Sequence, residues 1–327
     1  MKIVKKECTR ESGRVALCTL GSINWGAFRN PQEMRKACRI LVRSLSNLLS
    51  YQDFLSIQSK LANEDFEPLG VGITNLAYWH ARRSYRYGDA DSLAEVKRWM
   101  EHQAYYLTEA SVELAQERGP CTRSEYTYYG KGVFPWERRS KGADELTDFT
   151  PSMDWEPLRE RMKQYGIRNA TLMAVAPVES SSVVLNSTNG IEMPMELISV
   201  KESKAGSFVQ VVPEYKRLKN KYQLMWDQKD CVDYLKTAAV LAVYVDQSLS
   251  TNTFYNPAQF KDGKVPGTLI AKNLMLATKW GLKTIYYSLI NKVGSKNVLN
   301  TQSDRTLTAE PVTVYDELED DCEACKL

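Results

Sequence analysis

The sequence predicts an α/β protein, in which short buried strands alternate with amphipathic helices. Apolar runs bounded by turn residues, at Val15–Asn24 and Ala170–Ala176, are typical of buried strands. Apolar residues at helical spacing lie between them, and the clearest such stretch runs from Asn30 to Leu49. The chain has 327 residues, of which 43% are hydrophobic and 25% are charged, a composition typical of a soluble globular protein.

Charge and cysteine content exclude several classes of protein. With 43 basic and 40 acidic residues the net charge is +3, which gives no nucleic-acid-binding footprint. No apolar run reaches membrane-spanning length, and the first residues lack the apolar core of a signal peptide. The seven cysteines are scattered and odd in number, which argues against a secreted disulfide framework. We therefore expect a cytoplasmic protein with mostly reduced thiols, and neither nucleic acid nor membrane as a partner.

The first strand and helix each carry a cysteine. Cys18 lies at the centre of the strand Val15–Asn24, where a cysteine is most often a small hydrophobic residue. The helix from Asn30 to Leu49 begins with a capping residue, a proline and, at the third position, a glutamate. Cys38 falls beside its apolar stripe and is expected to contribute packing rather than chemistry.

A Gly-x-Gly pattern at Leu69–Trp79 resembles a dinucleotide-binding loop but has no third glycine and no hydrophobic strand before it. We expect a glycine-assisted tight turn into an apolar helix instead. Asp91–Arg118 is predicted to be a long amphipathic helix, closed by the Gly-Pro pair that follows it. His80 and His102 lie on helical stretches without other ligands at metal-binding spacing, so no metal site is predicted.

The remaining chain alternates between loops and regular elements. The stretch between Pro120 and Pro151 is rich in aromatic residues and predicts a long irregular surface excursion, which suggests a functional loop. The other predicted elements are a helix from Asp154 to Tyr165, a turn at Lys201–Gly206, a strand at Phe208–Val212, helices at Glu214–Trp226, Asp230–Leu249 and Gly267–Trp280, and a strand at Leu282–Leu289.

The strand Ala170–Ala176 leads into a loop that is suited to bind an anion. The loop consists of Pro177, Val178, Glu179, Ser180, Ser181 and Ser182, with a sequel at Asn186–Gly190. Its backbone N–H groups and hydroxyls can point at phosphate oxygens, and a helix that starts there adds its positive dipole end. The alternative is a serine-capped helix start with nothing bound.

Two further pairs of residues have candidate chemistry. Tyr286 and Tyr287 are neighbours on a strand, so they point to opposite faces, one in the core and one on the surface, unless the strand ends or bends. Cys322 and Cys325 follow an acidic run in a tail that is predicted to be disordered. They are either half of a zinc site or a dithiol that exchanges disulfides, and the absence of further ligands nearby favours exchange.

Taken together, these stretches resemble the C-terminal half of the large, catalytic subunit of class I ribonucleotide reductases. The matching stretches follow one another in the same order as in the family, along nearly the whole chain. It includes the stretches at residues 16–20, 69–72, 168–172, 177–182, 189–192, 211–213, 246–253 and 283–287, and the tail dithiol. It implies the second half of a ten-stranded α/β barrel with a flexible C-terminal tail. The implied divisions are an N-terminal tail at 1–14, the half-barrel at 15–290 and a redox-active tail at 291–327.

The resemblance also implies roles for the residues. Pro177–Ser182 corresponds to the substrate-phosphate loop, although the family usually has serine where this chain has Val178. Cys18 corresponds to one of two active-site cysteines that become a disulfide at each turnover. Tyr286 and Tyr287 correspond to tyrosines that relay a radical from a small subunit. Cys322 and Cys325 correspond to the pair that reduces the active-site disulfide and is itself reduced by thioredoxin or glutaredoxin.

One expected motif is missing from the sequence. The family carries its hydrogen-abstracting cysteine in an Asn-x-Cys-x-Glu loop, and none of the cysteines here has Asn two residues before it. We therefore expect one piece of a split large subunit, of the kind that an interrupted phage gene encodes, that requires a separate N-terminal chain with this loop. Other expected partners are a di-iron tyrosyl small subunit and a ribonucleoside diphosphate; no cofactor is expected on this chain. The alternatives are a catalytically dead binding or regulatory subunit and a stand-alone thiol oxidoreductase.

Overall fold

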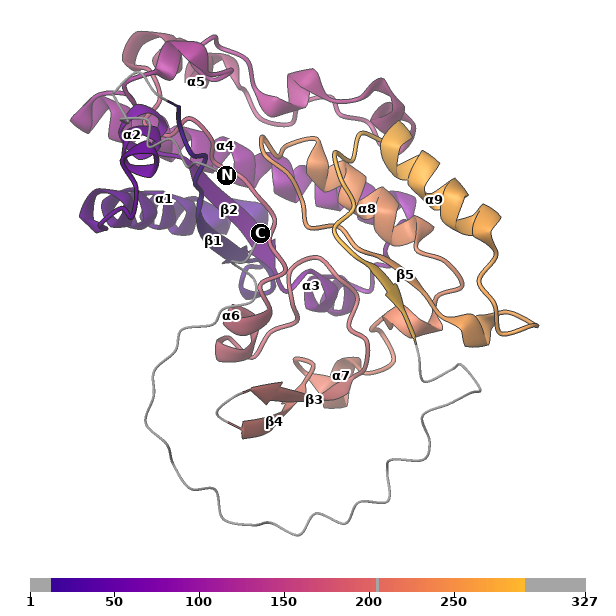
Figure 1. The fold of residues 1–327 in the computed structure, drawn as a ribbon. Helices are drawn as coiled ribbons and strands as arrows, with labels where there is room; N and C mark the ends of the chain where they lie inside the picture. The colour runs from indigo at the N-terminus through magenta and orange to yellow at the C-terminus, as the bar shows by residue number, and fades with distance from the viewer. Residues whose placement is uncertain (1–12, 204–205, 292–327) are drawn as a thin grey trace, which may run out of the picture.

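The computed structural model describes residues 13–203 and 206–291 (Figure 1). Two parallel strands, β1 (Thr19–Asn24) and β2 (Leu69–Thr74), pair with Thr19 opposite Leu69. The extended segment 171–175 lies on the other side of β2. The N–H groups of Leu69 and Val71 donate hydrogen bonds to the carbonyl oxygens of Thr171 and Leu172.

The arrangement of extended segments continues beyond 171–175. Val175 forms a parallel bridge with Leu249, and β5 (Thr253–Tyr255) pairs in parallel with β6 (Ser288–Ile290). The described segments thus form an open arc from β1 to β6 rather than a closed barrel. Mixed helices and parallel strands confirm the α/β prediction.

Helices cover one side of this arc (Figure 1). The longest, α4, packs against α1, α5 and α8, and α8 packs against α9. The helices are α1 (Met34–Tyr51), α2 (Ile57–Phe66), α3 (Leu76–Arg83), α4 (Ala90–Arg118), α5 (Glu156–Tyr165), α6 (Glu179–Val184), α7 (Tyr215–Leu218), α8 (Val232–Ala242) and α9 (Gly267–Lys279). No helix in the described part of the chain is long and apolar enough to cross a membrane.

The predicted ends of several helices are confirmed. Asn30 Oδ1 accepts a hydrogen bond from Glu33 N at 3.3 Å, as expected for the cap before α1. Helix α4 ends at Gly119, whose φ of +84° is a conformation that favours glycine. Asp154 Oδ1 accepts from Glu156 N at the start of α5. Local capping therefore predicts these boundaries well, because it depends on neighbouring residues alone.

Several strand predictions were wrong in extent. The first strand begins at Thr19 rather than Val15, and the last begins at Ser288 rather than Leu282. The run Ala170–Ala176 is extended and buries Leu172, Met173 and Val175, but it forms only an isolated bridge at Val175. Its position is set partly by a side chain: Asp246 carboxylate oxygens accept from Leu172 N at 2.7 Å and from Met173 N at 3.1 Å.

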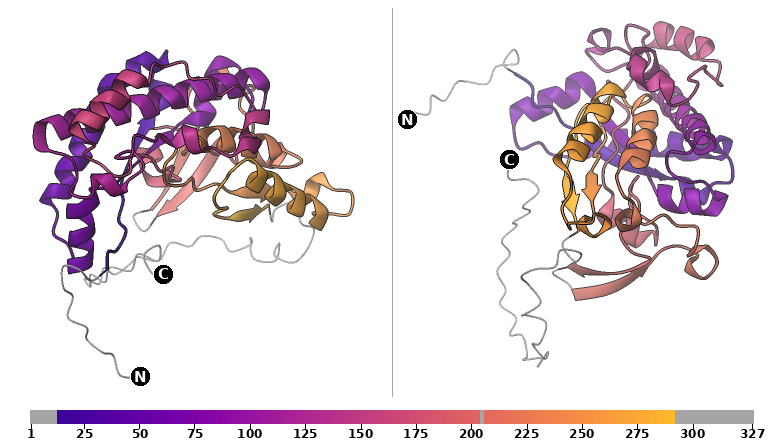
Figure 2. Two further views of the ribbon diagram at one scale, coloured as in Figure 1. Left: turned by 90° about the horizontal axis from the view of Figure 1, so that it is seen from above. Right: turned by 90° about the vertical axis from the view of Figure 1, so that its right-hand side faces the viewer.

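The stretch between 198 and 249 differs most from the prediction. The expected turn at Lys201–Gly206 belongs to a hairpin of β3 (Ile198–Ser203) and β4 (Gly206–Val211), which projects from the body (Figures 1 and 2). The expected helix Glu214–Trp226 is reduced to α7. The helix predicted to reach Leu249 ends at Ala242, because the chain beyond it extends to pair with 171–175.

The aromatic excursion after α4 is fixed to the body rather than confined to the surface. It contains three short 3-10 helices, Ser124–Tyr126, Pro135–Arg138 and Lys141–Glu145. Phe134 is fully buried, and Tyr129 is buried with its hydroxyl donating to Asp246 Oδ2 at 3.0 Å. The prediction of irregular structure is confirmed, but these two aromatic rings are core residues.

Candidate active site

The Gly-x-Gly pattern makes room for Cys18. Gly70 and Gly72 lie within the fully buried strand β2, so the prediction of a tight turn was wrong. A Cβ atom at Gly70 would lie 2.3 Å from Cys18 Sγ, and one at Gly72 would lie 2.7 Å from the carbonyl oxygen of Ala174. Glycine is required here because the neighbouring segments approach the backbone closely.

Cys18 is half-buried and lies immediately before β1. Burial raises the pKa of its thiol above the usual value. A hydrogen bond from Gln247 acts in the opposite direction, and the charge of Asp246 adds to the increase. Gln247 Nε2 lies 3.5 Å from Cys18 Sγ and donates to the Leu69 carbonyl at 2.7 Å. The side chain of Gln247 therefore bridges Cys18 and the start of β2. By contrast, Cys38 is fully buried in the core, as predicted.

The predicted phosphate loop begins at Pro177 and continues into α6. The N–H groups in the first turn of a helix have no partner within the helix, so those of Glu179, Ser180 and Ser181 are suited to face an anion. The side chains of Ser180 and Ser181 are exposed. Ser182 is fully buried, and its hydroxyl donates to the Glu179 carbonyl at 2.7 Å. Its side chain thus supports the loop rather than facing solvent.

The sequel Asn186–Gly190 fastens this loop to the end of β2. Asn75 N donates to the Asn189 carbonyl at 2.8 Å, and Asn75 Oδ1 accepts from Thr188 N at 2.9 Å. Gly190 N donates to the Pro177 carbonyl at 2.9 Å. The two halves of the loop are therefore held together at the carboxyl end of β2.

Val178 adopts an unfavourable conformation before α6. Its φ of +60° and ψ of +31° lie in the left-handed region, which β-branched residues rarely occupy. Val178→Asn is expected to raise the free energy of unfolding by about 1 kcal/mol, because asparagine tolerates this conformation. Urea unfolding measures the difference. Val184→Asn, on the exposed side of α6, is the matched control and should bring no gain; equal effects of both variants would contradict the strain argument.

The two tyrosines lie together just before β6. Their ring centroids are 4.1 Å apart with an interplanar angle of 48°, and both side chains are about half exposed. The expectation of one core and one surface tyrosine was wrong, because the regular strand starts only at Ser288. Hydrogen bonding to Tyr287 is the main cause that raises the pKa of Tyr286. Tyr286 N donates to the Thr251 carbonyl at 2.8 Å, which fixes the pair beside the preceding segment.

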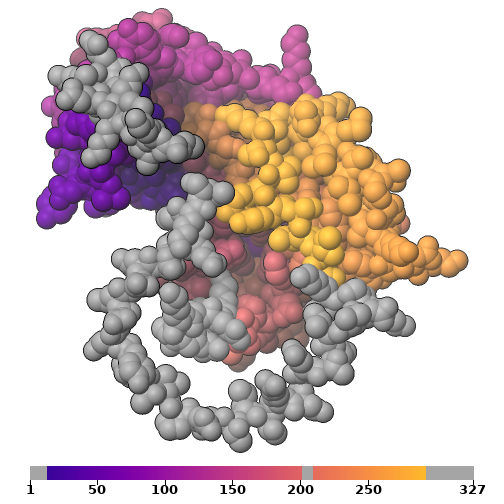
Figure 3. Space-filling model, in the orientation of Figure 1, coloured from indigo at the N-terminus to yellow at the C-terminus, as the bar shows by residue number. Residues whose placement is uncertain are grey.

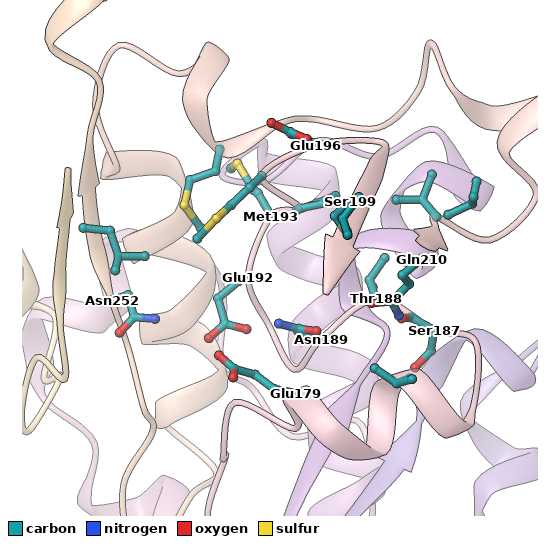
Figure 4. Close-up of a pocket in the computed structure, with 18 of the residues that line it drawn as sticks. Glu179, Ser187, Thr188, Asn189, Glu192, Met193, Glu196, Ser199, Gln210 and Asn252 are labelled. Atoms are coloured by element: carbon teal, nitrogen blue, oxygen red, sulfur yellow. The ribbon is translucent and has the colours of Figure 1, made fainter. Parts of the chain in front are cut away.

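One large cavity brings the phosphate loop and a tyrosine together. It has a volume of about 840 Å³, and its walls include Glu179, Ser180, Asn252 and Tyr287. Side chains from α6, from the loop after it and from the segment before β5 surround this space (Figure 4). Cys18 is not among the lining residues. Cys322 and Cys325 lie outside the described residues.

Glu192 is a candidate site residue that sequence reasoning missed. It lines the same cavity, is 8% exposed, and its Oε2 atom has no hydrogen-bond partner among the described residues. Burial raises the pKa of its carboxyl group to about 7, and the charge of Glu179 adds to this increase. The two carboxylates lie near each other in Figure 4. A glutamate amid the apolar residues Ile191 and Met193 was the signal available in the sequence.

Glu192→Gln is expected to stabilise the protein above neutral pH. The folded-state pKa is raised, so the folded state binds more protons than the unfolded one between pH 4.5 and about 7. Wild-type stability therefore falls across this range, and the variant removes a cost on the order of 3 kcal/mol at pH 8. Urea unfolding from pH 4 to pH 8 measures it. The exposed cavity residue Glu196, changed to Gln, is the control; parallel pH profiles for wild type and Glu192→Gln would refute the prediction.

The histidines have structural surroundings. His80 is buried, and its ring nitrogens lie 3.0 Å from the Leu76 carbonyl and 2.9 Å from Ser92 Oγ. Burial lowers the pKa of His80 to about 3, so the ring is neutral. His102 Nδ1 lies 2.8 Å from the Arg98 carbonyl. Within residues 13–203 and 206–291, no group of three or more potential ligands is arranged to hold a metal ion.

Comparison with known proteins identifies similar chains. The family described as "Ribonucleotide reductase, barrel domain" matches residues 5–288. The ribonucleoside-diphosphate reductase subunit alpha of Buchnera aphidicola subsp. Baizongia pistaciae is 42% identical over 277 residues, which cover 85% of this chain and 36% of that protein. The subunit of Haemophilus influenzae is also 42% identical, over 85% of this chain and 37% of its own length.

A phage protein shows the same relationship. The ribonucleoside-diphosphate reductase subunit alpha of Enterobacteria phage T4 is 36% identical over 317 residues, covering 96% of this chain and 40% of that protein. The present chain therefore spans between about a third and two fifths of the length of these relatives.

Proposed function

The chain belongs to the ribonucleotide reductase barrel family, and we propose that it forms the substrate-phosphate and radical-relay part of an aerobic ribonucleoside-diphosphate reductase. The observation that carries this proposal is the 840 Å³ cavity, because the predicted phosphate loop and Tyr287 line it together. A diphosphate held by the loop would place its sugar within the space that Tyr287 lines, and the ring of Tyr286 contacts that of Tyr287.

The loop is suited to bind a diphosphate through its backbone. The N–H groups at the start of α6 and the exposed hydroxyls of Ser180 and Ser181 supply hydrogen-bond donors. Val178 lacks the hydroxyl of the serine that the family usually has at this position. Binding through backbone N–H groups does not require that side chain. Diphosphate rather than triphosphate substrates are proposed because the relatives are named ribonucleoside-diphosphate reductases.

The tyrosine pair is suited to pass an oxidising equivalent. In the proposed order, Tyr287 is oxidised first by the small subunit, and Tyr286 then reduces Tyr287 and passes the oxidation to the hydrogen-abstracting cysteine. Each transfer moves one electron and one proton, and the ring contact of 4.1 Å keeps the two phenols close enough for this exchange. A di-iron tyrosyl centre on the small subunit would supply the initial radical, and in the proposal this chain itself binds no metal.

Cys18 is proposed to supply half of the reducing equivalents. The ribose loses its 2′-hydroxyl as water, while Cys18 and a second cysteine are oxidised from two thiols to one disulfide. Cys322 and Cys325 then reduce that disulfide and become a disulfide themselves, which thioredoxin or glutaredoxin reduces. Electrons balance at each exchange, because one disulfide forms as another is reduced.

The second cysteine and the Asn-x-Cys-x-Glu loop are proposed to come from a complementary segment, on a separate chain as expected above. The open sheet supports this proposal. In the described part of the chain β1 pairs only with β2, and the side chain of Leu20 on β1 is 56% exposed. Residues 15–290 would be the unit that completes the barrel, between tails at 1–14 and 291–327. A phage source stays a prediction, because the phage T4 relative is 36% identical and the two bacterial relatives are each 42% identical.

Reconstitution tests the proposed function. The chain is co-expressed with the N-terminal part of a related large subunit, and the complex is supplied with a small subunit, thioredoxin and a ribonucleoside diphosphate. We expect co-purification and formation of deoxyribonucleotide, and no product from this chain alone. A chain that stays monomeric and never binds the N-terminal part would refute the need for a complementary segment. A stable complex without product would favour a binding role.

A further inference from the structure

The cavity that contains the predicted phosphate loop has an acidic wall. Its lining residues include Glu179, Glu192 and Glu196, and among the described residues that line it there is no lysine, arginine or histidine. A ribonucleoside diphosphate is an anion, because its terminal phosphate loses its last proton at about pH 6. Such a ligand meets the backbone N–H groups of the loop and, in the same space, carboxyl groups that repel it when they are ionised.

Glu192 is the buried member of this set. Glu179 and Glu196 are exposed, so water and salt screen their charges, whereas Glu192 is 8% exposed. In Figure 4 its carboxyl group points toward Glu179, in the first turn of α6, where the loop presents its N–H groups. Glu192 therefore lies beside the place at which the loop would hold a phosphate.

The backbone before Glu192 is tied to the loop and to the core. Gly190 N donates to the Pro177 carbonyl at 2.9 Å, and the hydroxyl of Tyr87 donates to the Ile191 carbonyl at 3.0 Å. These bonds fix the backbone from which the carboxyl group projects. A group that is already held in place loses little entropy when a ligand arrives, which favours binding.

The carboxyl group has an unused hydrogen-bonding atom. Glu192 Oε2 is buried and has no hydrogen-bond partner among the described residues. An ionised oxygen in this position lacks both water and a donor, which is costly, whereas the neutral acid costs less and has an O–H group to donate. Burial raises the pKa of this carboxyl group to about 7, so both forms are populated near neutral pH.

The surroundings of Glu192 favour its neutral form. The charge of Glu179 raises its pKa further, and backbone N–H groups of Ile191 and Glu192 offset only part of the increase. Burial raises the pKa values of Tyr87 and Tyr234 well above the usual value, so both stay protonated while Glu192 titrates. The titratable groups that act on Glu192 or share its cavity are Glu179 on α6, Glu196 before β3, Tyr87 before α4, Tyr234 on α8 and Tyr287 before β6.

We propose that Glu192 binds the diphosphate as a neutral carboxylic acid whose O–H group donates a hydrogen bond to a phosphate oxygen beside the loop. This inference rests on the proposed function, and it adds a side chain to a site that otherwise consists of backbone N–H groups and serine hydroxyls. Wherever the free carboxyl group is ionised, each bound diphosphate is accompanied by one proton taken up from solvent. Affinity for the diphosphate is therefore coupled to pH.

Calorimetric titration of the full chain with cytidine 5′-diphosphate tests this coupling, in EDTA and between about pH 7.5 and pH 8.5, where the ligand's phosphates no longer titrate. Titrations in two buffers with different ionisation enthalpies give the number of protons that bind with the ligand. We expect close to one proton at about pH 8. Kd should rise about eightfold across this range, because the protonated fraction of the free carboxyl group falls by that factor.

Two substitutions separate the hydrogen-bond donor from its charge. Glu192→Gln keeps a donor that cannot ionise, so binding should continue without proton uptake and with a Kd that does not change with pH. Glu192→Met has a similar shape and no donor, and should bind at least about tenfold more weakly than Glu192→Gln. Glu196→Gln is the matched control: it removes a carboxylate from the same cavity but should retain the proton uptake of the wild type. Circular dichroism checks that each variant is folded.

Wild-type binding without proton uptake would overturn this inference and leave the loop as a diphosphate site. Binding that occurs only when Mg²⁺ replaces EDTA would overturn it as well, because Glu192 would then act as an ionised metal ligand. Equal Kd values for Glu192→Gln and Glu192→Met would show that no donor is used and would have the same consequence. If cytidine 5′-diphosphate binds neither the chain nor the reconstituted complex, the loop is not a phosphate site, and the proposed function fails together with this inference.

Discussion

Replacing Tyr286 by phenylalanine is expected to lower the turnover of the assembled reductase at least about a thousandfold, equivalent to about 4 kcal/mol in activation free energy. Phenylalanine has no O–H group and cannot give up an electron and a proton together. The ring contact with Tyr287 at 4.1 Å would be retained, because it involves only the rings. Stability and substrate binding should therefore change little while turnover is lost.

The measurement compares deoxyribonucleotide formation by the reconstituted complex with and without the substitution. Tyr287→Phe should have an effect of the same size, because both phenols are required in sequence. Tyr126→Phe is the matched control, since this tyrosine is 67% exposed and lies on the aromatic excursion, outside the proposed relay. Turnover above about a tenth of wild type in Tyr286→Phe would exclude the relay and favour a binding subunit.

Gly70→Ala should destabilise the chain by about 3 kcal/mol and disturb the environment of Cys18. The new Cβ would lie 2.3 Å from Cys18 Sγ, 2.8 Å from Leu20 Cδ2 and 3.1 Å from Ala174 Cβ. Because β2 is fully buried between its neighbours, it cannot move aside to relieve these contacts. The thiol or the strand must shift, and the bridge from Gln247 would be lost.

Urea unfolding measures the loss of stability, and the rate of Cys18 alkylation reports the change around the thiol. Gly267→Ala is the matched control, because a Cβ at that position meets nothing within 4 Å. It lies at the start of α9, where alanine favours the helix, and should be neutral or slightly stabilising. If Gly70→Ala were as stable as this control, Gly70 would not be required for the packing of Cys18.

The parts of the structure that depend on local sequence were predictable. The amphipathic stripe of α1 and the glycine after α4 mark these helices without information from distant residues. The loop at Pro177 also follows from sequence, because a strand that leads into serine residues indicates the start of a helix. Long-range contacts were not predictable in the same way. The glycines in β2 were wrongly interpreted as a turn. They are needed because atoms of Cys18 and Ala174, which are distant in sequence, leave no room for a side chain there.

The candidate site shows the same division. Cys18 and the tyrosines could be selected by residue type and resemblance, but their surroundings could not. The rings of Tyr286 and Tyr287 contact each other because the strand starts after them, and strand ends are set by pairing with distant segments. Glu192 was missed because its importance comes from burial in a cavity. Its sequence neighbours alone do not show which side chains will surround it.

The carboxylate of Asp246 has a consequence for the order of folding. It accepts hydrogen bonds from Leu172 N and Met173 N, which lie 74 and 73 residues away along the chain. The segment that leads into Pro177 thus depends on a contact that closes a long loop, and such contacts form late because loop closure costs entropy. We expect the helices to form first and the predicted phosphate loop to reach its final position only after Asp246 forms these hydrogen bonds.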